Sequence, residues 1–244
     1  MAEPATGETL TTVLAPAKLT MSLRVIGVRP DGYHEIDAEM VSLDLADELA
    51  FGDGDGLEVV GVGELPEPAE GNLVRRALRA VGRSAHVRLV KRIPAGGGLG
   101  GGSADAAAVL RWAGCDDVDL ALGLGADVPF CLRGGRARVR GIGEVIDPLP
   151  HVERTFTLVT PPFGCSTPAV YRAWDGLGGP HASGPNDLEP AALAVEPRLV
   201  RWRDALADAT GQVPTLAGSG STWFVPGAHP GEGRLVVHTV PAYG

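Results

Sequence analysis

The sequence predicts a fold that contains both β-strands and α-helices, arranged in two lobes. Apolar and polar residues alternate strictly over residues 18–25, which is the period of a β-strand. An Ala-rich stretch with the composition of a helix follows a Gly-rich run at 96–102, and a Pro-rich junction at Pro148 and Pro150 separates the two halves. The 244 residues, of which 44% are hydrophobic, suffice for one sizeable core or two modest lobes.

Composition also limits the partners and the location of the protein. The formal net charge of -9 repels nucleic acid and anionic membranes, so we expect neither as a partner. No apolar run approaches the roughly 18 residues that a membrane helix needs, and the first ten residues do not resemble a signal peptide, which predicts a cytoplasmic protein. Cys115, Cys131 and Cys165 are widely scattered, so we expect buried free thiols rather than disulfides or a zinc site.

The first elements form a predicted β-hairpin. In the strand at 18–25, Lys18 and Thr20 share the polar face and are therefore neighbours in space. The RPDG motif at 29–32 is a turn signal, and residues 33–49 form a second extended stretch with partial alternation. An antiparallel pair of strands joined by this turn is the simplest interpretation.

The next segment alternates strand and helix. We expect a short strand at 57–63, a surface loop at 64–70 and a strand at 87–94 that ends at a proline. Between the loop and the second strand, Asn72 can cap a helix with one apolar side, formed by Leu73, Ala77, Leu78 and Val81.

The Gly-rich run is the strongest functional signal. Six of the seven residues at 96–102 are glycine, and a helix is expected from Ser103 onward. Glycines let backbone N–H groups converge, while the first helical turn adds unpaired donors and the positive end of the helix dipole. We therefore favour phosphate binding over a flexible connector. The match to the dinucleotide motif GxGxxG is weak evidence, and no Lys-Ser or Lys-Thr pair follows as in a Walker loop. Asp105 would oppose an anion and is expected to be structural.

The second half of the chain supplies the remaining elements. We expect a brief helix within 125–135 and a strand at 136–140, followed by a lobe boundary that divides the chain into residues 1–150 and 151–244. The second lobe is expected to contain a strand, two helices and a Gly-Ser turn, at 156–161, 167–174, 196–209 and 217–222.

Four blocks of the sequence together resemble the GHMP kinase superfamily. They are APAKLTMSLRVIGVRPDGYHEID at 15–37, KRIPAGGGLGGGSADAAA at 91–108, LGADVPFCLRGG at 124–135 and AGSGST at 217–222. The GYH motif and the PAGGGLGGGSADAAA block resemble the branch that phosphorylates the 2-hydroxyl of 4-diphosphocytidyl-2-C-methyl-D-erythritol in non-mevalonate isoprenoid precursor biosynthesis. The resemblance implies a two-lobed α+β fold, in which the N-terminal lobe carries the nucleotide loop and the catalytic pair and a shortened C-terminal lobe is ferredoxin-like.

The resemblance also implies the cofactors and the site residues. The enzyme would use ATP and Mg²⁺ and act on a small molecule, and we expect a monomer or a homodimer. Lys18 and Asp127 would be the catalytic pair. Tyr33, His34 and Tyr171 would hold the cytosine, and Thr20 would contact the substrate. The residues in contact with ATP would be Asn72 and Lys91, near the adenine, and Pro94, Ala95, Gly96, Gly97, Gly98, Leu99, Gly100, Gly101, Gly102, Ser103 and Ala104, along the triphosphate.

Simpler interpretations stay open for several of these residues. Without the resemblance, Lys18 is by default a solvated surface lysine, and Asp127 is an N-cap whose carboxylate bonds the next helical turn. Tyr33 and His34 could be an incidental aromatic pair after a turn, and Tyr171 could belong to the core.

Two departures from the family pattern leave alternatives for the function. Thr20 stands where the family usually carries asparagine, and a hydroxyl cannot reproduce the pair of donors of an amide. The chain is shorter than typical members, and PGAHPGEG leaves no room for a helix between Val225 and Arg234. A sheet face exposed in this way could be covered by dimerisation or by the N-terminal lobe. The alternatives are a GHMP kinase for another small alcohol and a non-catalytic nucleotide-binding member.

Overall fold

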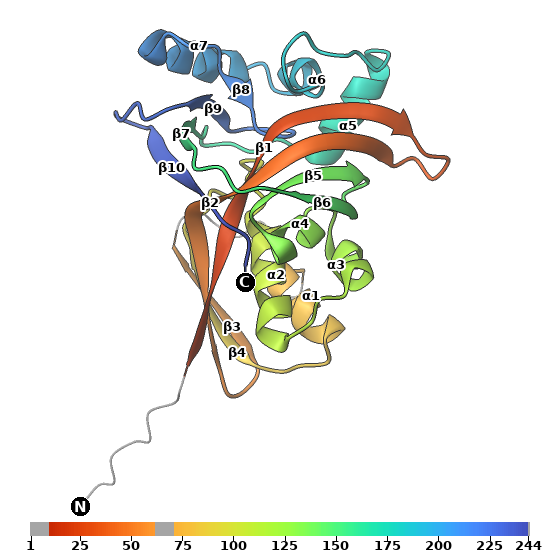
Figure 1. The fold of residues 1–244 in the computed structure, drawn as a ribbon, viewed down its shortest axis with the longest axis vertical. Coiled ribbons are helices and arrows are strands. Elements are labelled where there is room, and N and C mark those ends of the chain that lie inside the picture. The colour runs from red at the N-terminus through yellow and green to blue at the C-terminus, as the bar shows by residue number, and fades with distance from the viewer. Residues whose placement is uncertain (1–9, 62–70, 244) are drawn as a thin grey trace, which may run out of the picture.

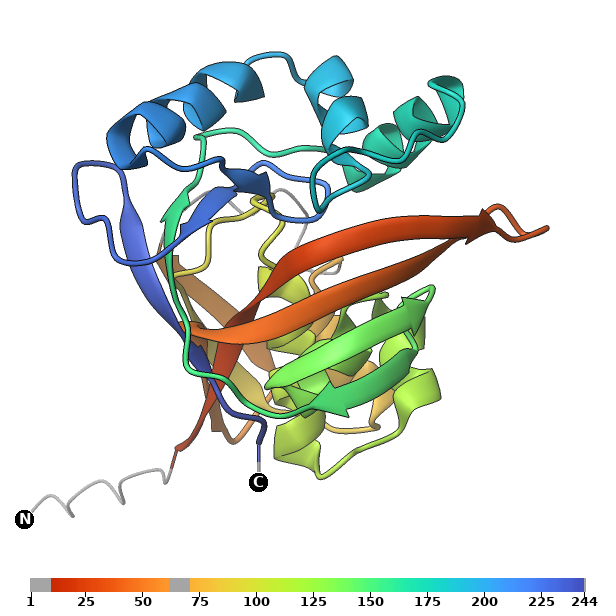
Figure 2. The same cartoon turned by 45° about the horizontal axis from the view of Figure 1, so that its top comes forward.

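A long β-hairpin organises the fold. The computed structural model describes residues 10–61 and 71–243 (Figure 1). Strand β1 (Thr11–Val28) pairs antiparallel with β2 (His34–Gly52) over nearly their whole lengths. Figures 1 and 2 show this pair as a curved ribbon that crosses the molecule. The predicted hairpin is confirmed, whereas the surface loop expected at 64–70 lies outside the described residues.

Irregularities in β1 change which of its side chains are buried. The register with β2 shifts at three places, one of them just before Lys18 and one just after Thr20. Such bulges bend a strand and break its alternation. Lys18, Leu19 and Thr20 are consequently all buried, so the strict division into an apolar and a polar face is wrong here.

The strands join into one sheet that runs through both halves of the chain. The main order is β3-β4-β2-β10-β7-β9-β8, and β5 pairs with another part of β2 and carries β6. The bounds of these strands are β3 (Gly56–Gly61), β4 (His86–Lys91), β5 (Arg136–Gly141), β6 (Val145–Leu149), β7 (Thr155–Val159), β8 (Thr215–Leu216), β9 (Trp223–Pro226) and β10 (Leu235–Val240). Because β10 pairs with both β2 and β7, the end of the chain connects the two halves. The expected lobe boundary falls between β6 and β7.

Helices of the N-terminal half pack together, with α2 against the hairpin (Figure 1). They are α1 (Leu73–Ala80), α2 (Gly101–Ala113), α3 (Val118–Leu124) and α4 (Val128–Arg133). All side chains of α2 from Ala104 to Leu110 are buried, because its alanines allow close approach. Helix α2 begins two residues before Ser103, and α3, which Asp117 caps, occupies an acidic segment in which the sequence predicted no helix.

Helices of the C-terminal half lie together on one side of the molecule, at the top of Figure 1. They are α5 (Thr167–Gly176), α6 (Glu189–Val195) and α7 (Leu199–Thr210). Helix α5 confirms the helix expected at 167–174. The single helix expected at 196–209 is shorter at its start, and α6 precedes it as a separate helix.

The connection between β9 and β10 is a loop, as expected. Residues 227–234, all of which the structure describes, contain no helix. The fully buried Thr157 hydroxyl of β7 donates to Gly227 O at 2.8 Å and accepts from His229 N at 2.9 Å. The loop itself therefore packs against this part of β7.

The cysteine and membrane expectations can also be compared with the structure. All three cysteines are free; Cys131 is buried, whereas Cys115 and Cys165 are partly exposed. The prediction was therefore right about free thiols and wrong about burial for two of them. Within residues 10–61 and 71–243, no helix combines the length and the apolar character needed to cross a bilayer.

Candidate active site

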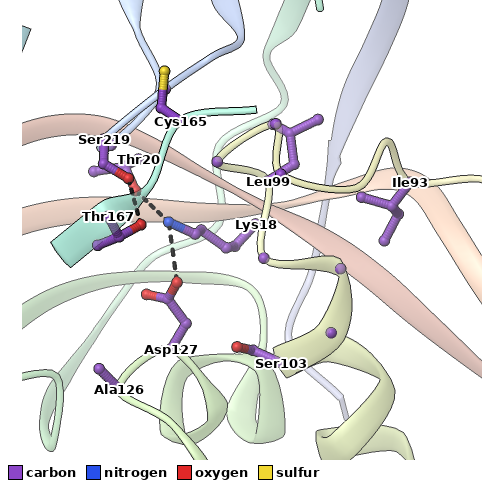
Figure 3. A pocket seen from close by; sticks show the side chains of 18 of the residues that line it. Lys18, Thr20, Ile93, Leu99, Ser103, Ala126, Asp127, Cys165, Thr167 and Ser219 are labelled. Atoms are coloured by element: carbon purple, nitrogen blue, oxygen red, sulfur yellow. Dashed lines mark hydrogen bonds and ion pairs between the residues drawn. The ribbon is translucent and has the colours of Figure 1, made fainter. Parts of the chain in front are cut away.

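A cavity of about 490 Å³ brings together segments from both halves of the chain. It is lined by the middle of β1, the Gly-rich segment, the start of α4, helix α5 and the turn before β9 (Figure 3). The sequence-predicted residues that line it are Lys18, Thr20, His34, Asn72, Lys91, residues 94–103, Asp127 and Tyr171. The structure thus gathers at one place residues that are distant in the sequence.

Lys18 and Asp127 face each other in this cavity. Lys18 Nζ lies 3.3 Å from Asp127 Oδ2 and donates a hydrogen bond to Thr20 Oγ1 at 3.1 Å (Figure 3). The Lys18 side chain is 7% exposed and that of Asp127 is 33% exposed. The interpretation of Lys18 as a solvated surface lysine is therefore wrong. The proximity of Lys18 and Thr20 is confirmed.

The local sequence of α4 explains why the Asp127 carboxylate is available. Asp127 is the N-cap residue, but its side chain makes no capping bond in this helix, which the structure describes in full. An N-cap side chain normally accepts from the second or third helical N–H, and the second helical residue here is Pro129, which has no N–H. The capping interpretation is wrong for the side chain, which instead points toward Lys18.

The second part of the Gly-rich segment lies against β1 and opens α2. Lys18 N donates to Leu99 O at 2.9 Å, which ties the segment to the strand. Gly100 has a φ of +69°, and a Cβ at this position would lie 2.7 Å from Lys18 Cγ. Only glycine allows this approach. The first N–H groups of α2, which have no acceptor inside the helix, therefore lie beside Lys18.

The first part of the segment lies against the C-terminal half. A Cβ on Gly98 would lie 2.5 Å from Ala217 O and 2.8 Å from Gly220 O, and Thr222 N donates to Gly97 O at 3.1 Å. These glycines are needed for packing of one backbone on another. The flexible-connector interpretation is wrong, and packing between the two halves explains part of the glycine content.

Lys91 belongs to a buried group of three charges at one side of the cavity. Its ammonium contacts Asp47 and lies 2.7 Å from Asp105 Oδ2. Asp47 also accepts the backbone N–H groups of Arg92 and Ile93. Burial lowers the pKa of Lys91, but the two carboxylates outweigh this effect, so the pKa is raised overall. The ammonium of Lys91 is thereby committed to protein partners.

Asp105 pairs with Lys91 inside the protein, which agrees with the structural role expected for it, but it accepts fewer hydrogen bonds than Asp47. The Oδ1 atom of Asp105 has no hydrogen-bond partner among the residues that the structure describes. Burial raises the pKa of Asp105 to about 7, although the Lys91 ammonium acts in the opposite direction. Asn72, on the same side of the cavity, accepts the N–H of Val74 at 2.8 Å as the cap of α1.

His34 and Tyr171 form an aromatic pair at another end of the cavity. Their ring centroids are 4.6 Å apart, and His34 Nε2 lies 2.8 Å from Asp175 Oδ1. Burial raises the pKa of Tyr171, which also packs against the core, as the simpler interpretation expected; its contact with a cytosine stays a prediction. Tyr33 is 59% exposed and is not among the described residues that line the cavity, so the structure separates it from the pair.

Two hydroxyl residues of the cavity had no predicted role. Thr167 Oγ1 and Ser219 Oγ are 2.7 Å apart, and Figure 3 shows them near Lys18, on the side opposite the Gly-rich segment. Both lie in segments that the sequence marked, a helix start and the AGSGST block. Their local patterns are also those of ordinary turns and caps, so nothing in the sequence pointed to the cavity.

Known proteins are similar to this chain in both sequence and fold. Residues 72–135 match the family described as GHMP kinases N terminal domain. The 4-diphosphocytidyl-2-C-methyl-D-erythritol kinase of Paracoccus denitrificans (strain Pd 1222) is 40% identical, covering 86% of this chain and 84% of its own length. That of Pelotomaculum thermopropionicum is 41% identical, covering 87% and 88%. The chain belongs to this kinase family.

Structural similarity also places the chain in the 4-diphosphocytidyl-2-C-methyl-D-erythritol kinase family. A solved structure described as 4-(cytidine 5'-diphospho)-2C-methyl-D-erythritol kinase superposes with a TM-score of 0.74 at 32% identity, covering 96% of this chain and all of the other. The chain is therefore a small-molecule kinase with the GHMP kinase fold. The resemblance read from the four sequence blocks is confirmed.

Proposed function

We propose that the protein transfers the γ-phosphoryl group of ATP to the 2-hydroxyl of 4-diphosphocytidyl-2-C-methyl-D-erythritol, in the non-mevalonate supply of isoprenoid precursors. The observation that carries the proposal is the Lys18–Asp127 pair, 3.3 Å apart, beside the Gly-rich start of α2 in one cavity. Relatives that bear this activity in their names share about two fifths of the sequence. We further propose a cytoplasmic monomer or homodimer.

The triphosphate would bind along residues 94–104. The unpaired N–H groups of the first turn of α2 and the positive end of its dipole favour an anion there. Asn72 and Lys91, which both line the cavity, would lie near the adenine. Because the Lys91 ammonium is held by Asp47 and Asp105, its contact with the base would come from its methylene stem.

The acceptor alcohol would lie between Asp127 and the terminal phosphate. Its oxygen forms a bond to the γ-phosphorus, the bond from that phosphorus to the β-phosphate oxygen breaks, and ADP leaves. Asp127 accepts the proton of the alcohol. Lys18, held by Thr20, keeps Asp127 oriented and offsets the negative charge of the transferring group. Positioning and charge are the main requirements of such a transfer.

The residues present fit a magnesium ion that is held mainly by phosphates. No group of three His, Cys, Asp or Glu side chains converges anywhere in residues 10–61 or 71–243. Asp127 and Ser103 supply oxygen atoms on the cavity side, and Mg²⁺ commonly takes one or two protein ligands together with substrate phosphates (Figure 3). When bound, the ion would neutralise charge on the phosphate oxygens.

The cytosine would bind at the His34 and Tyr171 rings. Both line the cavity, and a stacked position against an aromatic ring suits a planar base. Tyr33, in the hairpin turn, is the third residue of this proposed set. Its exposed ring would have to turn toward the base to take part.

An assay of ADP release tests the proposal. The methylerythritol substrate is compared with homoserine and with mevalonate at equal concentrations, and turnover is expected with the first alone. Turnover of either other alcohol, with none of the first, would establish the alternative of a GHMP kinase for a different alcohol. ATP binding without turnover of any alcohol, unaffected by Asp127→Asn, would establish a non-catalytic member.

A further inference from the structure

Asn186 is a buried amide that the reaction chemistry leaves unused. It lies between α5 and α6 and is 1% exposed. Its Nδ2 donates to Leu216 O at 2.9 Å and to Gly218 O at 2.7 Å, and its Oδ1 accepts from Leu188 N at 2.9 Å. All three bonds go to backbone groups, so the side chain fixes the backbone of residues 216–218 and that of Leu188 relative to each other.

The backbone around Asn186 is attached to the strand that carries the catalytic lysine. Leu23 N donates to Pro185 O, and Asp187 N donates to Leu23 O, both at 2.9 Å. This short parallel pairing belongs to β1, the strand of Lys18 and Thr20. The Asn186 side chain therefore connects β1 to residues 216–218 of the C-terminal half.

Residues 216–220 run from the end of β8 through a turn that lies beside Lys18. A Cβ placed on Gly218 would lie 3.5 Å from Lys18 Nζ and 3.7 Å from Thr20 Oγ1. On its other side the same turn meets Gly98 of the nucleotide segment, through Ala217 O and Gly220 O. The position of this turn thus sets the spacing between the catalytic lysine and the backbone that would bind phosphate.

We propose that Asn186 is a positioning residue of the phosphoryl transfer, whose amide fixes the 216–220 turn against Lys18 and the Gly-rich segment. The proposal rests on the proposed function. Asn186 acts through the turn, and it touches neither the Lys18 ammonium nor the Asp127 carboxylate. Displacement of a reacting group by about 1 Å can lower the rate about 100-fold, so a loosened turn would reduce kcat.

Asp187 attaches the segment around Asn186 to β1 by bonds of its own. The effect of the Asn186 side chain on the turn can therefore be tested separately from this attachment. The buried Asp187 carboxylate accepts from Arg24 Nη1 at 2.6 Å, from Val25 N at 3.1 Å and from Ala182 N at 2.9 Å. These bonds attach the segment to β1 independently of the Asn186 side chain. Removal of the amide therefore releases the turn and leaves the segment in place.

Asn186→Ala is compared with Gln212→Ala, which also removes an amide that supports backbone in the C-terminal half. Gln212 Nε2 donates to Pro226 O at 3.0 Å, and Gln212 does not line the cavity in the described structure. For Asn186→Ala we expect kcat to fall about 100-fold while KM for ATP stays within about threefold. Gln212→Ala should lower Tm and leave kcat unchanged. Asn186→Asp, which keeps the shape but loses both donors, should behave like Asn186→Ala.

A kcat of Asn186→Ala within threefold of wild type, or an equal fall in Gln212→Ala, would overturn the proposal. So would a loss confined to KM for ATP. If Asn186→Ala does not fold, Asn186→Ser, with one donor on a shorter side chain, replaces it under the same criteria. Turnover by the wild-type enzyme tests the proposed function separately. If another alcohol proves to be the substrate, the variants are compared on that alcohol.

Discussion

Two buried lysines of this protein have different surroundings. The side chains of Lys18 on β1 and Lys91 on β4 are 7% and 9% exposed, and each ammonium meets a carboxylate. Lys18 faces Asp127, whose side chain is 33% exposed to the cavity. Lys91 lies between Asp47 and Asp105, whose side chains are 0% and 5% exposed.

The two lysines differ in the exposure of their carboxylate partners rather than in their own burial. A carboxylate that opens to a cavity can accept a proton from a substrate and can still interact with a lysine. Two carboxylates enclosed with one ammonium leave no such access, and they balance the cost of burying charge. Burial of a lysine is therefore a poor guide to its role, whereas the exposure of its partner separates a reactive pair from a structural one.

The largest effect should come from the reactive pair. Under the proposed function, Asp127→Asn and Lys18→Ala should each lower kcat by roughly 10³-fold, because each would remove a group that acts on the transferring phosphate or the attacking hydroxyl. The dissociation constant for ATP should change by less than about threefold. Steady-state kinetics and nucleotide titration measure the two quantities. An equal loss of ATP affinity would place both residues in nucleotide binding and remove the contrast with Lys91.

The structural pair should respond in stability. Lys91→Met leaves Asp47 and Asp105 buried without a counter-charge, which typically costs about 3–5 kcal/mol. Urea unfolding measures the change. Arg92→Ala is the matched control, since its pair with Glu48 is largely exposed and should contribute less than about 1 kcal/mol. Equal stability losses in the two variants would show that the buried group contributes no more to stability than the exposed Arg92–Glu48 pair.

Asp105 should make the stability of the protein depend on pH. Its pKa is about 7 in the folded protein and 3.8 in the unfolded chain. Between pH 3.8 and about 7, the folded protein therefore holds a proton that the unfolded chain has released. The stability due to this proton is present below about pH 4 and is lost as the pH rises to about 7.

Asp105→Asn removes this titration and serves to measure it. Between pH 4 and 7, the free energy of unfolding of the wild type should fall relative to that of the variant, at up to about 1.4 kcal/mol per pH unit. Urea unfolding at several pH values gives the difference. A constant difference across this range would mean that Asp105 is ionised in the folded protein at all these pH values.

The smallest effect should come from Thr20. Thr20→Val keeps the shape of the side chain but removes the oxygen that accepts from Lys18 Nζ at 3.1 Å. A hydrogen bond from a charged group contributes about 1.5–3 kcal/mol, which corresponds to a roughly 10- to 150-fold lower kcat. A loss as large as that of Lys18→Ala would instead assign Thr20 a direct part in the reaction.

Local patterns predicted those parts of the fold that depend on neighbouring residues. The turn at 29–32, the helix capped by Asn72 and the Gly-rich entry to α2 all follow from spacing and backbone preference within a few residues. Helix α3 was missed because its seven residues are too few for a clear periodicity. The site residues of β1 and α4 were named through the resemblance and not through their surroundings.

The amino-acid sequence by itself determined the hairpin, the Gly-rich entry to α2 and the family of the protein. Only the tertiary structure decided that Lys18 meets Asp127, that Lys91 is enclosed by two carboxylates and that Gly97 and Gly98 pack against residues 217–222. The physical reason is that alternation, capping and glycine content act over a few residues. Burial and charge pairing depend on segments that meet only when the sheet and α2 have assembled.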